Sequence, residues 1–219
     1  MIAIVTGRPG SGKTTLAPLL SSELAWPLVS RDKIKEAMLE TLGIGVPVPL
    51  PLHEVEGLAA SGSGHPDPDP RKGLGVGVFV QQSHPHPLPL PPPGAQGEGV
   101  NARATDAFFA QVSRLAHQGS SLVAEAAFQH KVWAPRLALL AEVADVRVVV
   151  CEVPPDIAWS RRQERAGLDP HFAARHPDPP GHLGEREPYD PPSLPLPTLR
   201  VSTLEGYAPG LAEIVAFLG

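Results

Sequence analysis

The sequence has little of what marks secreted, membrane-spanning or strongly basic proteins. Cys151 is the single cysteine among 219 residues, so no internal disulfide can form, which is typical of a reducing compartment. No apolar run is long enough to span a membrane, and the apolar start at 1–6 is too short for a signal peptide and lacks its basic residues. We therefore expect a cytoplasmic protein. Cys151 lies in an apolar, strand-like run, so we expect a buried side chain and not a nucleophile.

Positive charge is also scarce. The formal net charge is −5, which gives no basic excess for nonspecific binding to nucleic acid or membranes. A local patch would still suffice for a nucleic-acid substrate. The nine histidines fit no zinc-ligand spacing, so we expect them to be solvent-exposed, with His176 at most a lid contact.

Proline, in contrast, is abundant, with 28 residues. Twelve lie between Val46 and Pro93, among Gly/Ser turns and Asp-Pro pairs. Such a composition cannot bury enough apolar surface to offset its ordering entropy, so residues 45–99 are predicted to be a largely disordered insertion, with one short strand at 75–82. Such segments can bind proline-recognition modules, but we favour a tolerated surface insertion without a partner.

Elsewhere, strand-like and helix-like patterns alternate. Strands are expected at 2–6, 28–30, 121–124, 146–153 and 199–202. Helices are expected at 12–24, 32–42, 104–118, 132–142, 155–166 and 209–218. This alternation predicts a three-layer α/β fold, in which a parallel sheet of about five strands is covered on both faces.

The most specific motif is Gly7–Thr14, which matches G-x-x-x-x-G-K-[ST] between a predicted strand and a predicted helix. Glycines let the backbone wrap around an anion, so that backbone N–H groups and the helix N-terminus point at phosphates. Lys13 adds positive charge on the β- and γ-phosphates, and Thr14 supplies a hydroxyl for Mg²⁺. The residues expected to bind ATP are Gly7, Pro9, Gly10, Ser11, Gly12, Lys13, Thr14 and Thr15.

The segment Leu28–Met38, after the first predicted helix, resembles the second conserved block of bacterial P-loop kinases of the AAA-like group. This group includes polynucleotide kinase, the zeta toxins and the chloramphenicol phosphotransferases. Weaker matches extend the resemblance to 123–128, to Arg161-Arg162-x-x-Arg165 and to 199–218, so it covers most of the chain outside the insertion.

The resemblance implies one nucleoside-kinase-like P-loop domain over 1–219, with strand order 2-3-1-4-5. It also implies that the Pro-rich stretch 167–197 is the lid. In that family, the aspartate after the second strand accepts the proton of the attacking hydroxyl, and Asp32 matches it. A carboxylate at a strand's carboxyl end suits this chemistry, because ligands bind there in parallel sheets.

Alternatives stay open for most of these residues. The alternative for Asp32 is that its negative charge only stabilises the N-terminus of a helix. Lys35, one helical turn further on, is expected either to bind an anionic acceptor or to be a solvated lysine paired with a neighbouring acid. Glu125 would hold Mg²⁺ or its water, or be a loop or cap carboxylate. At least one of Arg161 and Arg165 is expected to neutralise the transferring phosphoryl group, and the alternative is a solvated face paired with Glu164.

The function predicted from the sequence is a kinase that uses ATP and Mg²⁺ to phosphorylate a hydroxyl of a small molecule or a nucleic-acid end. No obligate protein partner and no membrane contact are expected. One alternative is a P-loop ATPase without a phosphate acceptor. Another is a non-enzymatic interaction protein on a decayed kinase fold.

Overall fold

The computed structural model describes residues 1–42, 93–176 and 188–219. The predicted insertion up to residue 92, its strand at 75–82 and lid residues 177–187 lie outside the described residues. So do five of the nine histidines, at positions 53, 65, 84, 86 and 182.

Five parallel strands form the sheet. They are β1 (Ile2–Gly7), β2 (Leu28–Ser30), β3 (Leu122–Glu125), β4 (Val146–Glu152) and β5 (Thr198–Ser202). Their order is β2-β3-β1-β4-β5, and every neighbouring pair is parallel. The predicted fold class and strand order are both confirmed.

The helices are α1 (Lys13–Glu23), α2 (Arg31–Thr41), α3 (Pro93–His117), α4 (His130–Ala141), α5 (Pro155–Leu168), α6 (Pro170–Arg175) and α7 (Leu211–Leu218). Helix α3 begins at Pro93 and not at Ala104. Residues 93–99, which were predicted to belong to the disordered insertion, therefore form the start of this helix. Proline is tolerated in a first helical turn, where its missing N–H costs nothing.

Helix α6 was not predicted, because the Pro-rich composition of the lid hid a local start signal. The Asp169 side chain accepts a hydrogen bond of 3.0 Å from the Phe172 backbone N–H, and Pro170 occupies the first turn. An N-cap aspartate followed by proline is a common helix start.

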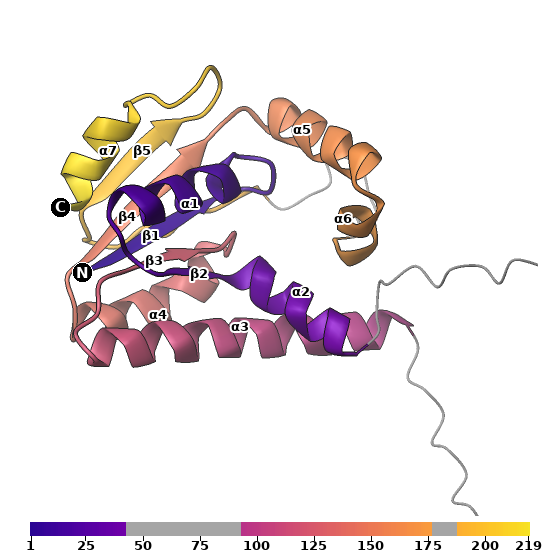
Figure 1. The fold of residues 1–219 in the computed structure, drawn as a ribbon, viewed down its shortest axis with the longest axis horizontal. Coiled ribbons are helices and arrows are strands. Elements are labelled where there is room, and N and C mark those ends of the chain that lie inside the picture. Colours follow the sequence, from indigo (N-terminus) through magenta and orange to yellow (C-terminus); the bar gives the residue numbers. More distant parts are fainter. Residues whose placement is uncertain (43–92, 177–187) are drawn as a thin grey trace, which may run out of the picture. The chain divides into compact units, whose positions relative to one another are not determined.

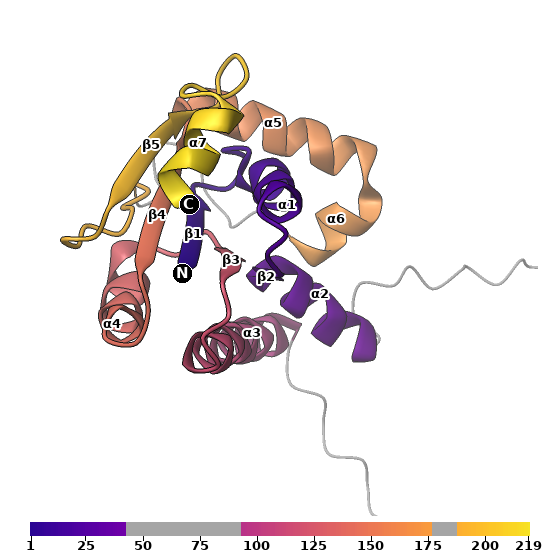
Figure 2. The same cartoon turned by 60° about the vertical axis from the view of Figure 1, so that its left-hand side comes forward.

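The alternation of side chains along β1 builds two cores. Ile2 and Ile4 belong to the cluster with α3 and α4, whereas Ala3 and Val5 belong to the cluster with α1 and α7. Figures 1 and 2 show these helix pairs on opposite faces of the sheet. Cys151 is 2% exposed in the second cluster, and burial raises its pKa to about 12, as expected for an unreactive strand residue.

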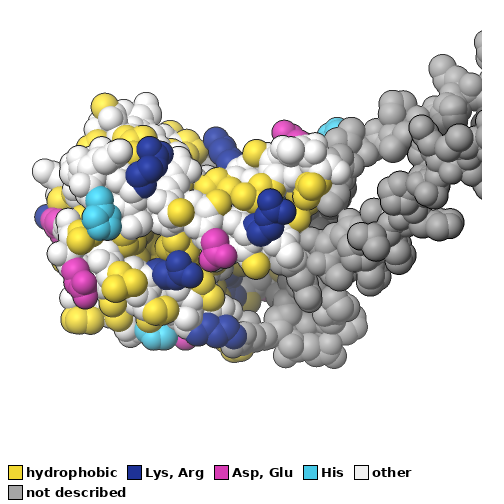
Figure 3. All heavy atoms as spheres, turned by 90° about the horizontal axis from the view of Figure 1, so that it is seen from below, with side chains coloured by type: hydrophobic (Ala, Val, Ile, Leu, Met, Phe, Trp, Pro, Cys, Tyr) yellow, Lys and Arg dark blue, Asp and Glu magenta, His cyan; other side chains and the backbone are white. Residues whose placement is uncertain are grey.

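Helices α5 and α6 form an arm beyond the carboxyl ends of the strands, and α6 lies next to α2 (Figures 1 and 2). Figure 3 shows the face over α3 and α4, where basic and acidic side chains stand singly among apolar ones. Within the described ranges, no helix is both long and apolar enough to cross a membrane.

Candidate active site

The loop between β1 and α1 wraps tightly. Gly10 and Gly12 have φ angles of 85° and 83°, in the left-handed region that favours glycine. A Cβ atom on Gly10 would lie 2.1 Å from the carbonyl oxygen of Ala158, so no larger residue fits there without a backbone shift. The Ser11 carbonyl accepts a hydrogen bond of 2.8 Å from Thr203 Oγ1, which ties the loop to the end of β5.

We call the group formed by Lys13, Thr14, Ser30 and Glu125 the phosphate side of the site, and Glu125 lies at its centre. Its carboxylate accepts hydrogen bonds from Thr14 Oγ1 at 3.1 Å and Ser30 Oγ at 2.7 Å, and lies 3.5 Å from Lys13 Nζ. The sheet register explains this meeting, because β3 lies between β1 and β2 and Glu125 is the register partner of both Val5 and Ser30. Lys13 is 5% exposed and Glu125 is 1% exposed.

A phosphate group fits this loop. Ser11 Oγ is buried and has no hydrogen-bond partner among the described residues. Ser11 does not line the cavity beside the loop, so the fit rests on the loop residues that do: an anion there meets the positive charge of Lys13 and the Thr14 hydroxyl, and Gly10 and Gly12 carry no side chain that would fill the space.

Asp32 lies in the first turn of α2 and lines the same cavity as Lys13 and Thr14, a space of about 520 Å³. Its Oδ1 is 3.3 Å from Arg31 Nη1. Burial alone would raise the pKa of Asp32, but the positive charge of Lys13, with contributions from His176 and Arg31, holds it below its ordinary value. Asp32 is therefore ionised at neutral pH.

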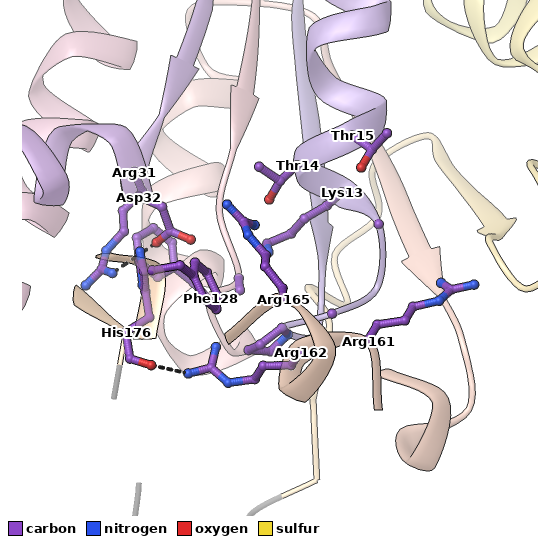
Figure 4. Close-up of a pocket in the computed structure, with 15 residues that line it drawn as sticks. Lys13, Thr14, Thr15, Arg31, Asp32, Phe128, Arg161, Arg162, Arg165 and His176 are labelled. Atoms are coloured by element: carbon purple, nitrogen blue, oxygen red, sulfur yellow. Dashed lines mark hydrogen bonds and ion pairs between the residues drawn. The ribbon is translucent and has the colours of Figure 1, made fainter. Parts of the chain in front are cut away.

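Helix α5 brings three arginines to the cavity, and they point differently (Figure 4). Arg165 points toward the phosphate loop, and its guanidinium carbon lies 4.1 Å from the centre of the Phe172 ring. Arg161 points away from Asp32, and its Nη2 donates to the carbonyl oxygens of Thr203 and Leu204 at 2.8 and 3.1 Å. Arg161 and Arg165 lie four residues apart on one helix, and the sequence assigns both the same candidate role, but their surroundings differ.

Lys35 does not line this cavity. Its Nζ donates a hydrogen bond of 3.0 Å to the Arg175 carbonyl, so it joins α2 to α6. Burial, with the neighbouring Arg31, lowers the pKa of Lys35. Neither sequence interpretation, acceptor binding or pairing with an acid, describes this contact.

His176 is a lid contact, one of the two outcomes expected for it. Its Nε2 lies 3.1 Å from Glu36 Oε1 on α2, and its ring lines the cavity. Burial lowers the pKa of His176, so the ring is neutral at neutral pH and its Nε2–H donates to Glu36. His171 is exposed, as expected.

A family model described as an AAA domain matches residues 2–176. The chain belongs to this family. The match confirms the resemblance to AAA-like P-loop kinases and spans the phosphate loop, Asp32, Glu125 and the lid as far as His176. A search of curated proteins found no match.

Solved structures show the same kinase-like fold. A proposed kinase from Chloroflexus aurantiacus j-10-fl aligns at a TM-score of 0.67 and 23% identity, over 99% of this chain and 95% of that chain. A protein named APE1195 aligns at 0.52 and 14%, over 100% and 92%. An APS kinase from Mycobacterium tuberculosis in complex with AMPPNP and APS aligns at 0.49 and 16%, over 99% and 96%, which is too distant to carry an argument. At these identities the likeness shows the fold alone.

Sequence reasoning missed several residues around the AAA-domain site. Phe128 and Phe172 line the cavity, and Ser30 holds Glu125. The position of Ser30 at the end of a predicted strand, beside Asp32, was an available signal. Phe172 carried no signal, because the composition of the lid predicted no structure there.

Tyr189 was also missed. Thr6 Oγ1 donates to the Ala126 carbonyl at 2.8 Å, so it accepts from Trp133 Nε1 at 3.1 Å and from the Tyr189 hydroxyl at 2.7 Å. Burial raises the pKa of Tyr189 to about 12, which keeps this hydroxyl protonated. The contact fixes the C-terminal part of the lid stretch 167–197 to the end of β1, just before the phosphate loop.

Proposed function

We propose that the protein is an ATP-dependent kinase that transfers the γ-phosphoryl group of ATP to a hydroxyl group of a small molecule or a nucleic-acid end. The observation that carries this proposal is that Asp32, an ionised carboxylate, lines the same cavity as Lys13 and Thr14 of the phosphate loop. A carboxylate at this place can accept the proton of an attacking hydroxyl, and the acceptor panel described below separates an alcohol acceptor from the water that an ATPase uses. The family match supports a nucleotide-binding, kinase-type protein.

In this mechanism, Lys13 and the loop N–H groups bind the phosphates of ATP. Asp32 accepts the proton of the acceptor hydroxyl while the hydroxyl oxygen bonds to the γ-phosphorus. The bond between that phosphorus and the oxygen bridging to the β-phosphate breaks, and ADP leaves. Arg165, which points toward the loop, would neutralise charge that develops on the transferring group.

Thr14 and Glu125 would hold Mg²⁺ together with phosphate oxygens of ATP. A hydroxyl and a carboxylate 3.1 Å apart suit the way this ion binds in nucleotide sites, through few protein oxygens plus phosphates. Mg²⁺ supplies charge neutralisation on the phosphates. The cytoplasmic location and the lack of an obligate protein partner stay predictions from the sequence.

The substitution Asp32→Asn tests the proposal. It keeps the shape of the side chain and removes the base, so phosphoryl transfer should fall by roughly 10²–10⁴-fold while ATP affinity changes little. Asp156→Asn is the matched control, because Asp156 is an exposed acid in the first turn of α5. The measurements are ATP affinity, melting temperature and phosphorylation of an acceptor panel with labelled ATP.

A helix-end role for Asp32 gives the opposite pattern. Stability would then fall by roughly 0.3–1 kcal/mol, as for Asp156→Asn, and transfer would persist. An ATPase without an acceptor would hydrolyse ATP at a rate that no alcohol in the panel alters. A decayed kinase would bind ATP without turnover.

A further inference from the structure

A row of stacked and hydrogen-bonded side chains crosses the cavity from the phosphate side to α2. Arg165 lies over the Phe172 ring at 4.1 Å, and this ring stacks on the His176 ring, with centroids 4.8 Å apart and planes at 28°. His176 Nε2 then lies 3.1 Å from Glu36 Oε1. Arg165 on α5 is thereby connected, through two residues of the α6 segment, to an acid on α2.

The position of α6 depends on its neighbours on both sides. Its six residues are too few for a stable isolated helix, since helices below about 12 residues are marginal in water. Helix α5 holds it through Arg162 Nη2, which donates to the His176 carbonyl at 2.7 Å. Helix α2 holds it through Lys35 and through the ion pair between Glu40 and Arg175 at 2.8 Å.

Arg165 needs such support. An arginine side chain has many rotamers, and a charge acts on a transferring phosphoryl group only if it is held in place beforehand. Phe172 offers the flat apolar face on which a guanidinium stacks, and Figure 4 shows Arg165 pointing toward the phosphate loop from there. No hydrogen bond or ion pair to a described residue is recorded for Arg165, which makes the ring its principal support.

We propose that Phe172 and His176 are positioning residues that hold Arg165 toward the phosphate loop while Glu36 keeps α6 docked on α2. The inference rests on the proposed kinase function and deepens it. Docking of the lid on α2, which carries Asp32, is in this way coupled to charge neutralisation at the phosphates. Phe172 and His176 act through Arg165 and not on the reacting atoms.

A double-mutant cycle tests the route through Arg165. Phe172→Leu keeps an apolar side chain and removes the ring, so it should lower kcat by about tenfold, while Kd for ATP stays within about twofold. Phe172→Tyr keeps the ring face and should restore kcat. In an Arg165→Ala background, Phe172→Leu should have no further effect, because the residue through which it acts is gone. Equal effects of Phe172→Leu in both backgrounds, or an unchanged kcat in the single variant, would overturn the proposal.

A second measurement tests the docking without turnover. Hydrogen exchange of the backbone amides at 171–176 is followed in the full chain with a non-hydrolysable ATP analogue. Glu36→Ala should raise their exchange rate by at least about threefold, and Lys33→Ala, an exposed position on the same helix, should not. Unchanged exchange in Glu36→Ala refutes the docking. If the parent protein shows no turnover at all, the proposed function fails, and the exchange result still decides whether Glu36 holds α6.

Discussion

The phosphate side of the site differs from the lid side, by which we mean the contacts between α2 and α6. On the phosphate side the side chains are mostly buried and form hydrogen bonds and ion pairs with one another, whereas on the lid side they are partly exposed and joined by single contacts. Glu125 has three partners and is 1% exposed. The Asp32 and Glu36 side chains are 36% and 29% exposed; Asp32 pairs with Arg31, and Glu36 accepts a hydrogen bond from His176. One side is preorganised for a fixed chemical group, and the other is held by fewer and more exposed contacts.

This difference follows from where the atoms come from. The phosphate side is made of three neighbouring strand ends and one tight loop, which the sheet holds rigidly. The lid side joins α2 to the short helix α6 through polar contacts, which contribute little stability when solvent reaches them. We expect substitutions on the phosphate side to abolish nucleotide binding and those on the lid side to alter rates.

The largest effect is expected for Lys13→Ala. Removal of the buried charge at the phosphates should weaken ATP binding and lower turnover by on the order of 10²-fold or more. Lys33→Ala, which removes an exposed lysine from α2, should leave both unchanged. Calorimetric titration with ATP and a phosphoryl-transfer assay measure these quantities, and parent-like values for Lys13→Ala would contradict the phosphate-side assignment.

Gly10→Ala should come next, because it combines a left-handed φ with a Cβ placed 2.1 Å from the Ala158 carbonyl oxygen. Gly119→Ala is its matched control, with a φ of 71° and no atom within 4 Å of the new Cβ. The control should lose about 1 kcal/mol of unfolding free energy from backbone strain alone, and Gly10→Ala at least about twice that, together with ATP affinity. Urea unfolding provides the comparison, and equal losses would show that the close approach costs nothing.

A smaller change is expected in the pH dependence of turnover. The ionised form of Asp32 is the base, and neighbouring positive charge lowers its pKa, so activity should persist toward acidic pH. Arg31→Ala removes one of these charges, which raises the pKa of Asp32, so the acidic limb of kcat/KM should move to higher pH. Arg136→Ala, at the surface pair with Asp106, should not move it. A limb that stays in place in Arg31→Ala argues that Asp32 is not the titrating base.

The smallest effect is expected for replacement of residues 46–92 by a short Gly/Ser linker. The end of α2 and the start of α3 pack together, since Leu42 and Val100 line one small cavity, and loop closure depends only weakly on length. Thermal melting and ATP affinity should stay close to the parent values. Loss of cooperative unfolding would mean that the segment belongs to the core.

Much of this protein could be predicted from the sequence. The strands, the phosphate loop and the proximity of Glu125 to Thr14 follow from local patterns together with one rule, that the carboxyl ends of parallel strands meet at one edge of the sheet. Asp32 could be placed near the loop for the same reason. The start of α3 at Pro93 and the existence of α6 could not, because proline-rich composition masks single helix starts.

The tertiary structure decided the rest. Arg161 and Arg165 share a helix and a residue type, yet only their surroundings, Thr203 for one and Phe172 for the other, separate their orientations. The hydrogen bonds of Thr6 with Tyr189 and Trp133, and that of His176 with Glu36, join residues more than 100 positions apart. Local sequence fixes backbone conformation through sterics and hydrophobic periodicity, whereas such contacts depend on how separate elements pack, which no short pattern encodes.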